Sequence, residues 1–268
     1  MITFNIDGMV YQRFGFPAPI MDYIFKNLKP HHLVKLYQCS KYFYAKFRQN
    51  IIQHLEIVND GEPEHFNPAL TSICFSNSAL PKLIDFWITD SFVYRAPMNG
   101  KFLPSFSNCT IEKLELCDYI LWSEYKIITK AESIKEMKII GILDFGDFVP
   151  IEDIIAEVPN ASSIEISESI TTATTYSSLM SLNHKAKISN VAFKNVSIFE
   201  PFDFVLLRDF FLKNAVTKCN ILFEFKLFHE ENQVFHDFNV RLKELSVHCS
   251  KQISLRLKQR ELLSRGIL

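Results

Sequence analysis

Glycine is scarce in this chain, with 7 residues among 268, and no hydrophobic run reaches the ~18 residues that a membrane-spanning helix needs. The scarcity of glycine argues against a flexible or low-complexity chain. The first seven residues contain neither the basic region nor the long apolar region of a signal peptide. We therefore expect a well-folded protein of the cytoplasm or nucleus that has no membrane partner.

Sequence motifs of catalysis and cofactor binding are also missing. The chain has no G-x-S-x-G nucleophile turn, no phosphate-binding Walker loop and no dinucleotide-binding G-x-G-x-x-G. Gly141 and Gly146 are expected in turns, and Asp144 and Asp147 on an exposed loop rather than in an active site. These absences predict a protein that is not an enzyme and binds no cofactor. A compact α/β hydrolase or transferase with an unrecognised site is the remaining enzyme hypothesis.

The six cysteines and eight histidines lack the spacing of a metal site. No C-x-x-C pair is present, and the histidines never show the paired spacing of a structural zinc site. Because no export signal is present, we expect the cysteines to be reduced and buried as small apolar side chains. The sequence therefore predicts neither a metal centre nor a disulfide framework.

Charge is almost balanced overall but unevenly distributed. The net charge of -1 gives no general attraction to nucleic acid, and the basic C-terminal end has no interleaved aromatic residues on which bases could stack. Residues 139–184 contain seven acids and no Lys or Arg. We interpret this stretch as a solvated edge with acidic helix N-termini, and a dedicated site for a basic partner is the alternative.

Apolar residues make up 48% of the sequence, and phenylalanine alone accounts for 25 positions, which predicts a large core rich in aromatic rings. Residues 16–51 concentrate apolar side chains at helical spacing. Pro17 suits the entrance of a first helix, Pro30 the first turn of a second, and Ser40 the N-cap of a third that extends to Ile51. A bundle of ~40 residues cannot bury all of these side chains by itself, so its sequence implies a partner.

The same residues resemble the F-box motif, in the divergent form of the large nematode families. The resemblance is carried by Phe16-Pro17, Ile20, Ile24-Phe25, Leu28, Leu33, Leu36, Cys39-Ser40-Lys41, Phe43 and Phe47. It implies docking onto the Skp adaptor of a cullin-type ubiquitin ligase. By the family pattern, the residues that line or support the adaptor-facing surface are Pro17, Ile20, Leu28, Leu33 and Leu36, whereas Ile24, Phe25, Phe43 and Phe47 hold the helices together. Pro19 and His32 stand where the family favours acidic residues. The alternative is the first helical hairpin of an ordinary domain.

Short strands alternate with helices from about residue 114. Each strand pattern contains two apolar residues around one central residue, and the second apolar positions are Leu116, Ile139, Ile166, Phe193, Phe223 and Leu255. Helices are predicted between them at 122–131, 151–158, 174–182, 201–215 and 231–247. Upstream, strands are predicted at 54–58 and 72–75 and a helix at 79–87.

Strand–helix units of roughly 20 to 30 residues that cannot cover their own apolar face are typical of a leucine-rich-repeat-like solenoid. A compact α/β domain is the alternative, although its strands would read as continuous apolar runs. We predict a mixed α/β chain with an F-box-like domain at 14–54 and an irregular repeat domain at 69–268, separated by the turn-rich segment 60–68. Central strand residues would face the concave surface, where we expect a target protein to contact Glu115, Lys138, Glu165 and Glu224.

Together these patterns predict a substrate-recognition subunit of a Skp-cullin-F-box ubiquitin ligase. Its partners would be the Skp adaptor with its cullin complex and an unidentified target protein. The alternative is a stand-alone interaction scaffold whose degenerate F-box does not bind the adaptor.

Overall fold

The computed structural model describes residues 7–8, 17–47, 50–67, 70–97, 103, 106, 108–198 and 203–227. The chain divides into two compact units. The first unit consists of Met1–Ala96 and Pro104–Ile111, and the second consists of Pro97–Leu103 and Glu112–Leu268. The sequence places a boundary at 60–68, whereas the first unit extends past this segment to Ala96. The reason is that the strands after the turn-rich segment pair with the strand before it.

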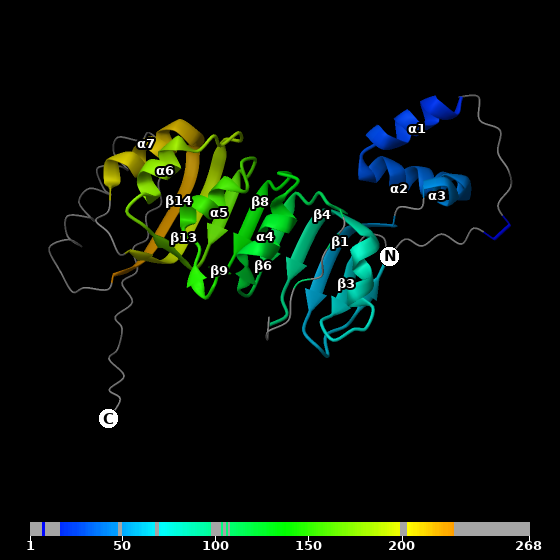
Figure 1. Cartoon of the computed structure of the whole chain (residues 1–268), viewed down its shortest axis with the longest axis horizontal. Helices are drawn as coiled ribbons and strands as arrows, with labels where there is room; N and C mark the ends of the chain where they lie inside the picture. Colours follow the sequence, from blue (N-terminus) through cyan, green and yellow to red (C-terminus); the bar gives the residue numbers. More distant parts are fainter. Residues whose placement is uncertain are drawn as a thin grey trace. The chain divides into compact units, whose positions relative to one another are not determined.

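The first unit begins with three helices, α1 (Ala18–Asn27), α2 (Pro30–Cys39) and α3 (Lys41–Phe47) (Figure 1). Helix α2 starts at Pro30 as predicted, because proline in the first turn has no N–H to leave unpaired. Ser40 ends α2 by donating its backbone N–H to Leu36 O at 3.0 Å, and its Oγ accepts the N–H of Tyr42 at 3.3 Å. The expected role of Ser40 between the two helices is therefore confirmed.

The helices share an apolar core of Met21, Phe25, Leu33, Val34 and Tyr37, to which Ile51 also belongs. The ring of Phe43 lies 5.4 Å from that of Phe25 and joins α3 to α1. The prediction that the third helix reaches Ile51 is wrong. This isoleucine lies on a strand that starts at Asn50, because Ile51 and Ile52 are β-branched and pack into a sheet.

The first unit contains a sheet with the strand order β2-β3-β1-β4-β5, parallel at every pairing except that of β2 with β3. Its strands are β1 (Asn50–Val58), β2 (His65–Phe66), β3 (Thr71–Cys74), β4 (Phe86–Tyr94) and β5 (Asn108–Cys109). A short 3-10 helix, η1 (Leu80–Asp85), stands where a helix to Trp87 is predicted. Trp87 instead lies on β4, a nine-residue strand that the sequence analysis missed.

The second unit contains a parallel sheet with the order β6-β8-β11-β13-β14, and β12 also pairs with β13. These strands are β6 (Lys113–Leu116), β8 (Glu136–Ile139), β11 (Ser163–Ile166), β12 (Ser169–Thr171), β13 (Ile188–Ile198) and β14 (Ala215–Leu227). A small second sheet joins β7 (Ile120–Leu121), β9 (Ile142–Asp144) and β10 (Asp147–Phe148). The mixed α/β class with mostly parallel sheets is thus confirmed.

Four helices connect these strands: α4 (Trp122–Thr129), α5 (Ile151–Ala156), α6 (Thr175–Ser181) and α7 (Phe204–Asn214). All four are predicted from the sequence, with bounds that differ by at most three residues. Asp203 caps α7 by accepting the backbone N–H of Leu206 at 3.0 Å. The predicted helix at 231–247 lies outside the described residues.

The strand register agrees with the predicted apolar ladder. Leu116 pairs with Ile139, Ile139 with Ile166, Ile166 with Phe193, and Phe193 with Phe223, and each is at most 3% exposed. The sixth predicted member, Leu255, lies outside the described residues. Each of these parallel strands therefore turns its second apolar residue to the same face of the sheet.

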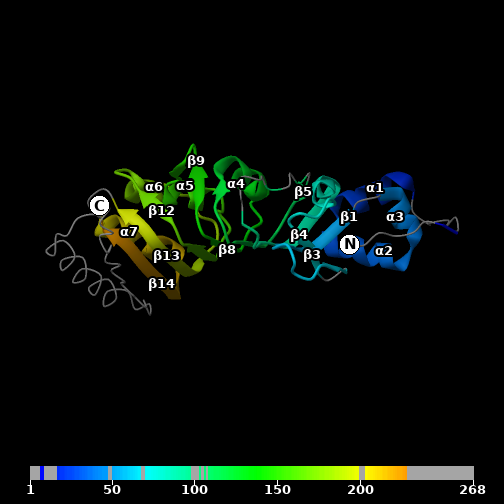
Figure 2. The same ribbon diagram turned by 90° about the horizontal axis from the view of Figure 1, so that it is seen from below.

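The connecting helices cover this apolar face. Tyr125 of α4 donates its hydroxyl to Ile154 O at 3.0 Å and contacts Met137 of β8, while the ring of Phe211 of α7 lies 5.7 Å from Phe223. Figure 2 shows α4, α5 and α6 on one side of the strands of this unit. The opposite side presents the central residues of the strands.

Candidate interaction surfaces

Helix α1 displays apolar side chains that the three-helix core does not bury. Ile20 is 46% exposed, Tyr23 is 70% exposed, and Pro17 lies exposed at the N-cap of the helix. Spacings of three residues place Pro17, Ile20 and Tyr23 along one side of the helix. We call these three residues the α1 face. Tyr23 is not among the residues predicted from the sequence, although its spacing of three residues from Ile20 indicates the same side of the helix.

The other predicted adaptor-facing residues lie deeper. Leu33 is 2% exposed and belongs to the core of the helices, so it can support an adaptor-facing surface from inside but does not line one. Leu28 and Leu36 are half-buried and pack against that core. Of the helix-joining residues, Phe25 is buried and Ile24 and Phe43 are half-buried, as their expected role requires. The side chain of Phe47 lies outside what the structure describes.

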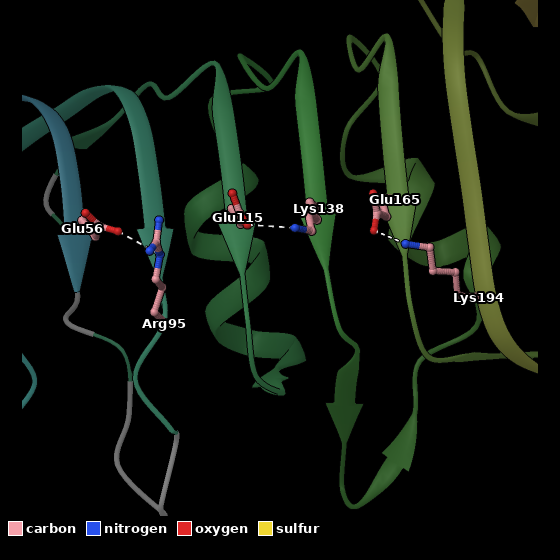
Figure 3. Close-up of polar contacts among 6 residues, drawn as sticks. All are labelled: Glu56, Arg95, Glu115, Lys138, Glu165 and Lys194. Carbon is pink, nitrogen blue, oxygen red and sulfur yellow. Dashed lines mark hydrogen bonds and ion pairs between the residues drawn. The ribbon is translucent and has the colours of Figure 1, made fainter. Parts of the chain in front are cut away.

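The second candidate surface is a row of charges on the side of the second unit's sheet opposite α4, α5 and α6. Glu115, Lys138 and Glu165 occupy directly paired positions on β6, β8 and β11. The Lys138 ammonium lies 3.0 Å from Glu115, and Lys194 of β13 lies 2.5 Å from Glu165 (Figure 3). We call Glu115, Lys138, Glu165 and Lys194 the charge row. It alternates in sign across four strands.

The charge row stabilises its own cation. A hydrogen bond and the negative charge of Glu115, with a further contribution from Glu165, raise the pKa of Lys138 above its ordinary value of 10.5. In the first unit, Arg95, which directly follows β4, lies 2.8 Å from Glu56 of β1 (Figure 3). Predicted target-binding residues Glu115, Lys138 and Glu165 thus lie together, but they neutralise one another.

Glu224 does not belong to the charge row. It lies on β14 two residues beyond Leu222, the partner of Ala192, just as Lys194 lies two residues beyond Ala192 on β13. Within the described residues, however, Glu224 forms no ion pair with Lys194, which pairs with Glu165 instead. The register between β13 and β14 is irregular between Phe193 and Val196. Lys194 was not anticipated in the row, because apolar spacing alone does not reveal which charged residue lies diagonally opposite Glu165.

The acids of residues 139–184 are divided among different environments. Glu165 forms an ion pair, whereas Glu152 of α5 is 5% exposed and accepts hydroxyl hydrogen bonds from Thr172 at 3.2 Å and Thr175 at 2.8 Å. Burial raises the pKa of Glu152, and the hydrogen bonds oppose this effect. Glu152 thereby ties α5 to the start of α6. Asp144 and Asp147, in contrast, lie exposed at the end of the β9–β10 hairpin.

The cysteines occupy both buried and exposed positions. Five lie in the described part of the chain, all as free thiols, as expected from the sequence. Cys109 and Cys219 are buried, and burial raises the pKa of Cys109 to about 11. The expectation of burial is wrong for Cys39, which lies exposed at the end of α2, where only one side of the helix faces the core.

Comparison with protein-family models, curated proteins and solved structures found no match. Within the described ranges, no helix has both the length and the apolar character needed to cross a membrane. The same residues contain no group of three or more His, Cys, Asp or Glu side chains that could hold a metal ion.

Proposed function

We propose that the chain is the substrate-recognition subunit of a Skp-cullin-F-box ubiquitin ligase, acting in the cytoplasm or nucleus. The α1 face carries this proposal. Ile20 and Tyr23 remain exposed beside Pro17 although the other apolar residues of the helices form a core of their own. Apolar side chains that cluster on an exposed helix are typical of a protein interface.

The resemblance of residues 16–47 to the F-box gives this surface a partner. The three helices have the expected order, the break at Pro30 and the cap at Ser40. In this reading the α1 face contacts the Skp adaptor, with Leu28 and Leu36 at its margin and Leu33 supporting the helices from inside. Asp22, which forms a 3.5 Å ion pair with Lys46, would lie at the polar rim.

The second unit supports a role in binding a protein target. Successive strand–helix units stack in register, and α4, α5 and α6 lie on one side of the strands, which supports the proposal of a leucine-rich-repeat-like solenoid. A compact doubly covered sheet would instead have apolar residues on both faces. The central positions of β6, β8 and β11 are charged, so this side of the sheet can accept a polar protein surface.

Such a subunit needs two binding surfaces and no active site. Holding a target beside a ubiquitin-charged enzyme raises the effective concentration of the target lysine, and the attached enzymes carry out the transfer. In this proposal the α1 face of the first unit binds the adaptor, and the second unit binds the target.

A stand-alone scaffold remains the second candidate. Pro19 and His32 replace the acidic residues that the F-box family favours, and both are exposed. His32 also lies beside His31, with 3.1 Å between the two Nε2 atoms. If these positions prevent docking, the α1 face would bind another protein and the chain would not enter a ligase.

The test compares two variants of the full chain that place the same charge at equally exposed positions. Ile20→Asp introduces a carboxylate into the proposed contact, where it would be desolvated, so co-purification with a co-expressed Skp-type adaptor should fall at least 10-fold. Leu212→Asp is the control, because Leu212 is 49% exposed on α7 of the other unit. Equal adaptor recovery with both variants, or none with the unmodified chain, would reject the adaptor role.

A further inference from the structure

The β9–β10 hairpin of the second unit holds a phenylalanine entirely in solvent. Phe145 is 101% exposed, the highest value among the large apolar residues of the described chain. Asp144 and Asp147 pair with each other across the hairpin, so Phe145 and Gly146 form a two-residue turn. We propose that Phe145 is the anchor by which the chain binds a protein partner with an apolar pocket rimmed by Lys or Arg.

The conformation of the turn does not favour phenylalanine. Phe145 has φ 49° and Gly146 has φ 97°, the two positive values of a type I′ turn. Asparagine is preferred at the first of these positions, because its short polar side chain tolerates the left-handed region far better than a bulky ring. Since the ring is fully exposed, it gives the fold no packing in return. The residue is therefore better explained by a contact outside the chain.

The hairpin is mounted firmly enough to present such an anchor. Strand β9 pairs with β7, and the Phe148 ring lies 5.8 Å from that of Tyr119. Tyr119 donates its hydroxyl to Glu168 at 2.7 Å, and this hydrogen bond, aided by burial, raises the pKa of Tyr119 to about 12. A rigid aromatic anchor loses little conformational entropy on binding.

Charge next to the anchor indicates the chemistry of the partner. Asp144 and Asp147 are exposed, and within the described chain neither forms an ion pair or a side-chain hydrogen bond. Two unpaired carboxylates beside an apolar side chain complement a pocket with basic residues at its rim. They also disfavour anionic lipid surfaces, so the arrangement fits a protein rather than a membrane. The anchor role of Phe145 rests on the proposed function in one respect only, which is that the partner is taken to be the target of the ligase.

The experiment uses the full chain with Phe145 replaced by the photo-crosslinker p-benzoyl-L-phenylalanine, irradiated in an extract of the organism's own cells. Excess unlabelled wild-type chain should abolish the protein adduct, whereas Phe145→Asn should need at least 10-fold more protein to do so. Ile127→Asn is the matched control, because Ile127 is 48% exposed on α4, and it should compete like the wild type. The thermal midpoint of Phe145→Asn should equal or exceed that of the wild type, which shows that lost competition is not misfolding.

The attachment sites on the adduct, mapped by mass spectrometry, should lie at apolar residues with Lys or Arg neighbours. No protein adduct, a lipid adduct, equal competition by Phe145→Asn, or an acidic rim would each overturn the proposal. Recovery of the Skp-type adaptor in the same reactions separates this inference from the proposed function. Ile20→Asp should lose the adaptor and keep the adduct. If the chain with Ile20 unchanged gives the adduct but recovers no adaptor, the ligase role alone is rejected.

Discussion

Reversing the charge of Lys138 is the perturbation that best tests the charge row. Lys138 lies between Glu115 and Glu165 on directly paired positions of adjacent strands. Lys138→Glu removes two attractions and places three carboxylates side by side, whereas Lys138→Met removes the attractions alone. Both variants keep an unbranched side chain on an exposed position, so packing should change little.

The magnitude follows from the spacing of the strands. Opposite charges on neighbouring strands contribute about 0.2–1 kcal/mol for each pair, and like charges destabilise by similar amounts. With ~0.5 kcal/mol for each of two lost attractions and two new repulsions, Lys138→Glu should lower the free energy of unfolding by about 2 kcal/mol. Lys138→Met should lower it by about 1 kcal/mol, since only the attractions are lost.

Urea unfolding at low and high salt measures this difference. Because the screening length falls from ~10 Å at 0.1 M salt to ~3 Å at 1 M, the gap between the two variants should shrink by more than half. Lys218→Glu is the control, because Lys218 is exposed on β14 and forms no ion pair within the described residues. Equal stability of the two Lys138 variants at low salt, or a gap that salt does not change, would refute the alternating row.

Two further predictions concern the second unit. Glu152→Gln should keep the contacts with both threonines and stabilise the protein at pH 7, because it removes a buried charge. Since the folded-state pKa of Glu152 is raised, the wild type loses stability as pH rises from 4.5 through that pKa. The advantage of the variant should therefore vanish on acidification, which thermal unfolding at pH 4 and pH 7 would reveal. Gly141→Ala should lower the free energy of unfolding in urea by about 1–3 kcal/mol. The new Cβ would lie 3.0 Å from the backbone oxygen of Glu168 and 3.2 Å from both Phe148 and Tyr119. An unchanged unfolding midpoint would show that these neighbours move aside.

Much of the second unit could be predicted because its signal is local. Alternation of apolar and polar residues along each short strand fixes which face is buried, and the spacing of Leu116, Ile139 and Ile166 sets their register. In the first unit, Pro30 and Ser40 likewise indicate the two ends of α2. Strand β4 was missed because helical and strand patterns are hard to separate in a short apolar run such as Phe86-Trp87-Ile88.

The candidate surfaces depend on tertiary contacts and were only partly predictable. Apolar spacing places Ile20 and Leu33 in one motif, but only packing decides that the first is exposed and the second buried. The contacts of Glu224 could not be predicted, because the irregular register between β13 and β14 leaves no mark in the apolar pattern. Phe145 was overlooked because a phenylalanine in sequence is normally assigned to a core.

Amide hydrogen exchange of the full chain, with and without a Skp-type adaptor, would show whether the α1 face binds this adaptor. The adaptor should slow exchange in α1, at residues 18–27, and leave exchange in the strands β6, β8 and β11 unchanged. Binding that protects the second unit instead of α1, or no protection anywhere at saturating adaptor, would contradict this prediction.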